Sequence, residues 1–245
     1  MIRRTLAAAA TTVLSLACAH TPSNEAPAGS GAGAGSSDPG AWQQEFGEDE
    51  RDLASAGRNA FFVLEPGYTL EFEGQEDGKK AALVIRVLDE TRDVGGVKAR
   101  VVEERESLGG ELVEVSRNFF AISQKTHNVY YLGEEVDIYE GGRVAGHEGA
   151  WVHGKDGARY GLFVPGTVRV GDRFYQEIAP GTAMDRAEIV SASAAVDTPV
   201  GRFDGCLKIE ETTPLEPGSK EHKCFAPGIG LVRDGGLRLV RHGKS

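Results

Sequence analysis

The fold class is decided by the stretch Tyr68-Thr69-Leu70-Glu71-Phe72-Glu73, the turn Glu76-Asp77-Gly78 and the run Ala81-Ala82-Leu83-Val84-Ile85. In the first segment apolar and polar side chains alternate, which is the period of a strand with one buried face. The second run is apolar on both sides and favours a strand covered above and below. The stretch therefore predicts two antiparallel strands joined by a turn.

The same kind of pattern continues along the chain, where short segments rich in β-branched and aromatic residues are separated by Gly and Pro turns. No internal repeat of fixed period is present, which disfavours propellers and solenoids. We expect an all-β antiparallel meander that forms an open or half-closed barrel around a curved sheet, within a single domain of residues 58–245. The expected strands are Tyr68–Glu73, Ala81–Leu88, Val97–Glu104, Leu112–Ile122, Asn128–Leu132, Val136–Glu140, Gly149–His153, Arg173–Ile178, Ala187–Ser193, Cys206–Thr212, Glu221–Phe225, Leu231–Arg233 and Leu237–Val240.

The first 19 residues have the layout of a signal peptide, with basic Met1-Ile2-Arg3-Arg4 followed by an apolar stretch. The run Leu14-Ser15-Leu16-Ala17-Cys18 resembles a bacterial lipobox, which predicts a lipid anchor on Cys18. A cut after Ala19 is the alternative. We therefore expect export, as a lipoprotein facing the periplasm or the outer membrane or else as a secreted soluble protein.

Two further segments precede the β-rich region. Residues 20–41 consist mostly of Gly, Ala, Ser and Pro, and they predict a disordered tether because they offer little apolar surface to bury. Residues 42–57 contain acids and alanines that favour a short helix ended by Gly57.

The charge of the chain argues against nucleic acid as a partner. The net charge is −10, and cleavage before Cys18 would remove two of the 27 basic residues and none of the 37 acidic ones, which leaves −12. Binding to phosphate backbones needs clustered Lys and Arg. We expect membrane association only through a lipid on Cys18, and the sequence names no protein partner.

Catalytic and cofactor motifs are missing from the sequence. It contains no Gly-x-Ser-x-Gly elbow, His-Glu-x-x-His pair, phosphate loop or EF-hand loop, so we expect no cofactor and no catalytic residues. Asp185 and Glu188, on either side of Arg186, favour an ion pair over an acid/base pair. An unrecognised hydrolase stays open as an alternative, since a triad is assembled in space.

Cys206 and Cys224 are candidates for a disulfide, because they lie on two expected strands that flank one turn and export favours oxidation. The alternative is two small buried side chains. His222 would share a strand face with Cys224, so Cys206, Cys224 and His222 form a weak candidate metal site. His147 and His153 form a weaker pair, because Gly146 and Gly149 disfavour a continuous strand.

Aromatic residues are the remaining candidates for a binding site. Phe119, Phe120, Tyr130, Tyr131 and Trp151 either line a cavity for a hydrophobic small molecule or belong to an ordinary core.

Several runs between residues 60 and 241 resemble a family of uncharacterised bacterial exported proteins and lipoproteins. They are Asn128-Val129-Tyr130-Tyr131-Leu132-Gly133-Glu134-Glu135, Gly149-Ala150-Trp151, Gly157-Ala158-Arg159-Tyr160-Gly161-Leu162, Tyr175-Gln176-Glu177, Ala183-Met184-Asp185-Arg186-Ala187-Glu188, Thr213-Pro214-Leu215-Glu216-Pro217-Gly218, Glu221-His222-Lys223 and Ala226-Pro227-Gly228-Ile229-Gly230-Leu231-Val232. This resemblance implies no mechanism. The β-rich lipoprotein pattern is also similar to periplasmic carriers whose incomplete barrel surrounds a lipid-sized cavity.

These observations favour a non-catalytic envelope lipoprotein that carries or senses a hydrophobic ligand or lipid. A structural or partner-binding envelope protein is the alternative.

Overall fold

The computed structural model describes residues 41–244 of the chain. The expected signal peptide, Cys18 and all of the expected linker except Ala41 lie outside the described residues. The elements are η1 (Glu50–Asp52), β1 (Leu53–Ala54), β2 (Gly57–Asn59), β3 (Phe62–Leu64), β4 (Tyr68–Glu76), β5 (Lys79–Val94), β6 (Val97–Leu108), β7 (Glu111–Ser123), β8 (Val129–Glu140), β9 (Arg143–Gly146), β10 (Trp151–Val152), β11 (Arg159–Val164), β12 (Arg173–Tyr175), β13 (Glu177–Ile178), β14 (Arg186–Thr198), β15 (Gly201–Thr212), β16 (Lys220–Ala226), β17 (Gly230–Asp234) and β18 (Leu237–Lys244).

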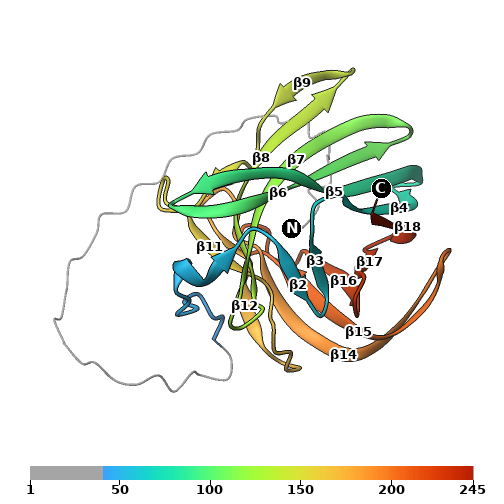
Figure 1. Ribbon diagram of the computed structural model, residues 1–245. Helices are drawn as coiled ribbons and strands as arrows, with labels where there is room; N and C mark the ends of the chain where they lie inside the picture. Colours follow the sequence, from blue (N-terminus) through green and yellow to red (C-terminus); the bar gives the residue numbers. More distant parts are fainter. Residues whose placement is uncertain (1–40, 245) are drawn as a thin grey trace, which may run out of the picture. The chain divides into compact units, whose positions relative to one another are not determined.

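The protein is an all-β, antiparallel, nearly closed barrel, which confirms the predicted fold class (Figure 1). Thirteen strands follow the order β12-β14-β15-β16-β17-β18-β4-β5-β6-β7-β8-β11-β13. The turn between β4 and β5 has the two residues Asp77 and Gly78, both with positive φ, as a tight hairpin turn requires. No helix among residues 41–244 is long and apolar enough to cross a bilayer.

The two ends of this strand order are consecutive in the sequence, because only Gln176 separates β12 from β13. β12 pairs with β14 and β13 pairs with β11, so the segment Arg173–Ile178 brings the first and last strands of the barrel together. Gly161 of β11 packs directly on this segment: a Cβ there would lie 2.3 Å from the Gln176 carbonyl carbon and 2.5 Å from the Tyr175 oxygen. Only glycine fits at this point of the closure.

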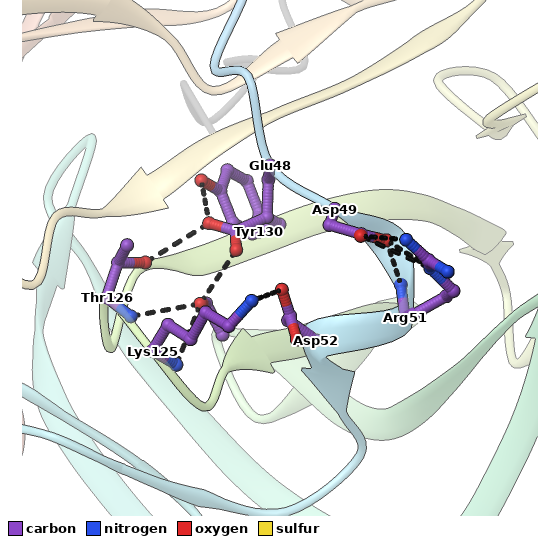
Figure 2. A network of polar contacts seen from close by, with 8 residues as sticks. Glu48, Asp49, Arg51, Asp52, Lys125, Thr126 and Tyr130 are labelled. Atoms are coloured by element: carbon purple, nitrogen blue, oxygen red, sulfur yellow. Dashed lines mark hydrogen bonds and ion pairs between the residues drawn. The ribbon is translucent and has the colours of Figure 1, made fainter.

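Residues 42–54, which we call the strap, lie against the outside of the barrel. In place of the helix expected for residues 42–57, the structure has the single 3₁₀ turn η1 and the short strands β1 and β2, because the strap finds its hydrogen bonds on the barrel wall. Its Glu48 carboxylate accepts hydrogen bonds from the hydroxyls of Ser123, Thr126 and Tyr130 at 2.9–3.1 Å (Figure 2).

The hairpin β2–β3 forms a separate two-stranded sheet that crosses the inside of the barrel. β3 contacts both β7 and β17, which β18, β4, β5 and β6 separate in the sheet order. The buried Asn59 fixes the hairpin by donating to the carbonyls of His127 and Pro165 at 2.8 and 3.0 Å. The hairpin therefore supplies side chains to the interior without belonging to the wall.

Candidate ligand-binding site inside the barrel

The barrel encloses a cavity of about 60 Å³, which we call the apolar cavity. This volume exceeds the ~10–15 Å³ that one water needs, so the cavity has room for several waters or a short apolar chain. Most of its wall consists of aromatic and aliphatic side chains from the barrel and the hairpin. The lining residues are Phe62, Val63, Tyr68, Leu70, Ile85, Val87, Val102, Glu104, Asn118, Phe120, Tyr131, Phe163, Lys223, Phe225, Ile229, Gly230, Leu231 and Asp234.

Aromatic rings from several barrel strands and the hairpin meet at this wall. Phe120 stacks on Tyr131 with ring centroids 4.8 Å apart, and both rings contact Phe163. Phe62 of the hairpin lies 5.3 Å from Phe120, and Phe225 lies 6.3 Å from Phe163. The rings offer a rigid apolar surface that loses little conformational freedom on binding.

A β-bulge decides which side chains of β8 face this cavity. Phe119 pairs with Gly133, but the next residue, Phe120, pairs with Tyr131, so Leu132 is the extra residue. Regular alternation would place Tyr131 and Glu134 on opposite faces, since they are three residues apart. The bulge turns both toward the interior.

Polar side chains gather beside the aromatic wall. We call them the inner polar cluster, and they come from β6, β7, β8, β13, β15, β16, β17 and the residue between β12 and β13. Four of them line the cavity and the others lie next to those four. The members are Glu104, Asn118, Glu134, Gln176, Glu177, Glu211, Lys223 and Asp234.

Lys223 and Glu211 form a buried ion pair in this cluster, with Nζ and Oε2 2.8 Å apart and side chains 7% and 0% exposed. Burial alone would raise the pKa of Glu211, but the attraction of Lys223 lowers it to about 2. Burial likewise opposes the charge on Lys223, yet Glu211, Asp234 and Glu221 hold its pKa well above the usual value. Both groups are therefore charged at neutral pH.

The other carboxyls of the cluster have raised pKa values. Burial raises the pKa of Glu104 to about 7 and, together with repulsion from Asp185, that of Glu177 to about 8. Burial and the charge of Glu177 raise the pKa of Glu134 well above its usual range. These groups hold protons near neutral pH unless a positive charge comes close.

Hydrogen bonds order part of the cluster and leave two oxygens without donors. Tyr131 donates to Asn118 Oδ1 at 2.7 Å, and the Trp151 indole donates to Glu177 Oε2 at 2.8 Å. Glu134 Oε2 and Gln176 Oε1 receive no hydrogen bond from any residue in 41–244, although their side chains are buried. Buried acceptors without donors are uncommon and costly.

The structure separates the five aromatic residues that the sequence singled out. Phe120 and Tyr131 line the apolar cavity. Phe119 lies on the other face of β7 under the guanidinium of Arg92, and Tyr130 lies beneath the strap, where it donates to Glu48 (Figure 2). Trp151 packs edge-on against Tyr131 and reaches the cluster through Glu177.

The expected disulfide between Cys206 and Cys224 is not formed. Both residues are free thiols, and both are buried. The register pairs Leu207 with Phe225 and Lys208 with Cys224, so the two cysteines are diagonal neighbours about 7–8 Å apart, too far for a disulfide. Burial raises the pKa of Cys206 to about 11. His222 instead lies 3.4 Å from Glu210, and residues 41–244 contain no group of three His, Cys, Asp or Glu arranged to hold a metal ion.

The other sequence candidates lie in ion pairs or contacts outside the cavity lining. Glu188 pairs with Arg173 at 2.9 Å, and His147 lies 3.1 Å from Asp137. His153 packs against Tyr160 with ring centroids 5.0 Å apart.

Sequence reasoning missed most of the inner polar cluster. One signal was present in β16, where Lys223 and Phe225 share a strand face by alternation. A charged residue beside a large apolar one on the same face indicates an interior ion pair or a ligand contact. Glu211 carries the same signal on β15, where it alternates with Leu207 and Ile209. The partners of these charged residues come from distant strands, so the sequence does not show which side chains meet in the cluster.

Comparison with family models, with curated proteins and with solved structures finds no match to this chain. The resemblance to uncharacterised exported proteins therefore stays a prediction. What the site can do follows from its own residues: an aromatic cavity that ends at a group of buried carboxyls, an amide and one paired lysine.

Proposed function

We propose that the barrel binds a small hydrophobic molecule in the apolar cavity and serves as a carrier or sensor. The observation that carries this proposal is the cavity itself, which lies among side chains that otherwise pack closely and is lined by Phe120, Tyr131, Phe163 and Phe225. Ligand sites in proteins are concave, mostly apolar and supplied with a few polar groups that orient the ligand.

The size of the cavity sets the expected affinity. The volume has room for about four water-sized groups, so about four carbons of a chain would be buried, and each buried CH₂ contributes about 0.8 kcal/mol. The gross gain of about 3 kcal/mol corresponds to millimolar binding of such a fragment. A larger natural ligand would make further contacts with the protein and bind more tightly than this fragment.

A titration of 1-hexanol into the ¹⁵N-labelled full chain, followed by NMR, tests the proposal. We expect saturable shifts at residues around the cavity. Ile85→Trp would fill the cavity and weaken binding at least about tenfold. Val84→Trp, on the other face of β5, is the matched control and should leave the affinity within about twofold. No saturable shift, or equal effects of the two variants, would contradict the proposal.

We also propose that the protein acts at the cell envelope, held by a lipid on Cys18. Support comes from the signal-like residues 1–19 and the lipobox-like run that ends at Cys18. Mass spectrometry of the full chain expressed in a bacterium should show a lipid-modified Cys18 in the membrane fraction. Cys18→Ser should move the protein to the soluble fraction, and an unmodified wild-type thiol would contradict the anchor.

A further inference from the structure

We propose that the inner polar cluster selects a ligand that carries an amino group in its cationic form, so that the barrel prefers a cationic amphiphile to a neutral or anionic one. This inference rests on the proposed function, since the apolar cavity would hold the chain of the same molecule. The ammonium would lie at the polar end of the cavity, where Glu104 and Asn118 form part of the wall.

The balance of charge at this end of the cavity favours a cation. Lys223 is already neutralised by Glu211 at 2.8 Å, which leaves the carboxyls of Glu104, Glu134 and Glu177 as further acidic groups. An anionic headgroup would meet these carboxyls, and the inner polar cluster of the described residues contains no second lysine to attract it. A buried carboxylate is strongly stabilised by an opposite charge that also donates hydrogen bonds.

The two buried oxygens without donors give an independent indication. Glu134 is 4% exposed and Gln176 is 1% exposed, yet Glu134 Oε2 and Gln176 Oε1 find no donor among residues 41–244. Glu134 pairs in register with Asn118, which lines the cavity, and the Gln176 amide bonds to Glu211 inside the same cluster. An ammonium presents three N–H donors and no acceptor, which is what such oxygens require.

An organic cation fits better than a metal ion. Within the described part of the chain, no three His, Cys, Asp or Glu side chains are arranged as metal ligands. The adjoining wall is aromatic and would pack against the methylene groups of an alkylamine, and ring faces also attract cations. The inferred ligand class is therefore an alkylamine or a larger amphiphile with an amino headgroup.

Three probes of equal chain length separate charge from hydrophobicity: hexylamine, 1-hexanol and hexanoate, titrated calorimetrically into the full chain at pH 8. We expect hexylamine to bind about tenfold tighter than 1-hexanol, since a charge-assisted hydrogen bond contributes about that factor. Hexanoate should bind more weakly than 1-hexanol. Repeating the hexylamine titration in buffers of different ionisation enthalpy should reveal proton release, because the cation displaces protons from Glu134 and Glu177, whose pKa values are raised the most.

Glu104→Gln tests the assignment of the charge. It should reduce the preference for hexylamine over 1-hexanol to about threefold or less. Glu103→Gln makes the same change of charge at the neighbouring position of β6, where the side chain faces away from the cavity toward Arg117, and should keep the full preference. Glu134→Gln is the second variant of the cluster and should act like Glu104→Gln.

Each outcome of these titrations has a distinct meaning. Equal binding of hexylamine and 1-hexanol, or tighter binding of hexanoate, would overturn the inferred selectivity and leave the proposed function standing. Failure of all three probes to bind would overturn the proposed function as well. If a variant does not fold, the three probes on the unaltered protein still decide the question.

Discussion

The apolar cavity and the inner polar cluster are built by neighbouring strands of one barrel, yet they are stabilised in different ways. Burial of rings such as Phe120 and Phe225 stabilises the fold because it removes apolar surface from water. The members of the polar cluster lose hydration, and only specific partners such as the Lys223–Glu211 pair offset that loss. The cavity therefore tolerates changes of shape, whereas the cluster is sensitive to the loss of a single partner.

The largest effect is expected from Lys223→Met, which leaves the Glu211 carboxylate buried without its ammonium partner. Removing one member of a buried pair costs about 3–5 kcal/mol of unfolding free energy. Lys220→Met, which removes the exposed pair with Glu210, is the control and should cost less than about 1 kcal/mol. Urea unfolding measures the free energy of unfolding of both variants. Similar losses would show that water reaches the Lys223–Glu211 pair.

A somewhat smaller effect is expected at the closure beside Gln176. Gly161→Ala would place a methyl group against the backbone of Tyr175 and Gln176 and force the segment Arg173–Ile178 outward. Overpacking of this kind costs about 1–3 kcal/mol. The exposed Ser193→Ala is the control and should be neutral in thermal unfolding. A neutral Gly161→Ala would contradict the tight closure.

The carboxyls of the cluster should make stability depend on pH. The pKa values of Glu104 and Glu177 are raised to about 7 and about 8, so between pH 5 and 8 the folded state binds more protons than the unfolded state. The unfolding free energy therefore falls as pH rises through this range. Each of the two groups lowers it by at most about 1.4 kcal/mol per pH unit.

Glu177→Gln and Glu104→Gln should each flatten this decline, because an amide stays neutral at every pH. Denaturant unfolding at several pH values checks this, with the outer-face Glu103→Gln as control. A decline that is unchanged in both variants would assign the pH dependence to other groups.

The smallest effects are expected at two adjacent tyrosines that face opposite sides of β8. Tyr131→Phe leaves Asn118 Oδ1 buried without its donor, at a cost of about 1–2 kcal/mol. Tyr130→Phe should cost less than about 1 kcal/mol, since Glu48 keeps its bonds to Ser123 and Thr126 (Figure 2). Chemical denaturation measures the free energy of unfolding of both variants. A larger loss for Tyr130→Phe would mean that the hydrogen bond to the strap stabilises the protein more than the one inside the barrel.

The sequence can predict the sheet but not the composition of its interior. Alternation in Tyr68–Glu73 and the turn Glu76-Asp77-Gly78 are local signals, and the hairpin β4–β5 follows them directly. The run Ala81–Ile85 predicts cover on both sides, but Val84 on the outer face stays partly exposed. Local pattern thus indicates strands and turns better than it indicates burial.

The candidate site is predictable only in part, because its residues meet through long-range register. The sequence singles out Phe120 and Tyr131 as aromatics, but the bulge at Leu132 that brings Glu134 beside them is marked in the sequence only by the adjacent Gly133, which does not fix its position. The prediction that Cys206 and Cys224 lie on neighbouring strands is confirmed. They are two positions out of register, so their side chains do not face each other and form no disulfide. Such offsets depend on pairing across the whole barrel.

The most direct test of a ligand inside the barrel is an NMR experiment on the full chain with bound hexylamine and ¹³C-labelled Glu and Phe. Nuclear Overhauser effects should connect the methyl end of the chain to the rings of Phe120 or Phe225. At pH 6, below the raised pKa of Glu104 of about 7, the Glu104 carboxyl resonance should also move toward its ionised position. Overhauser effects confined to exposed residues such as Glu90, with an unmoved Glu104 resonance, would contradict an interior binding site.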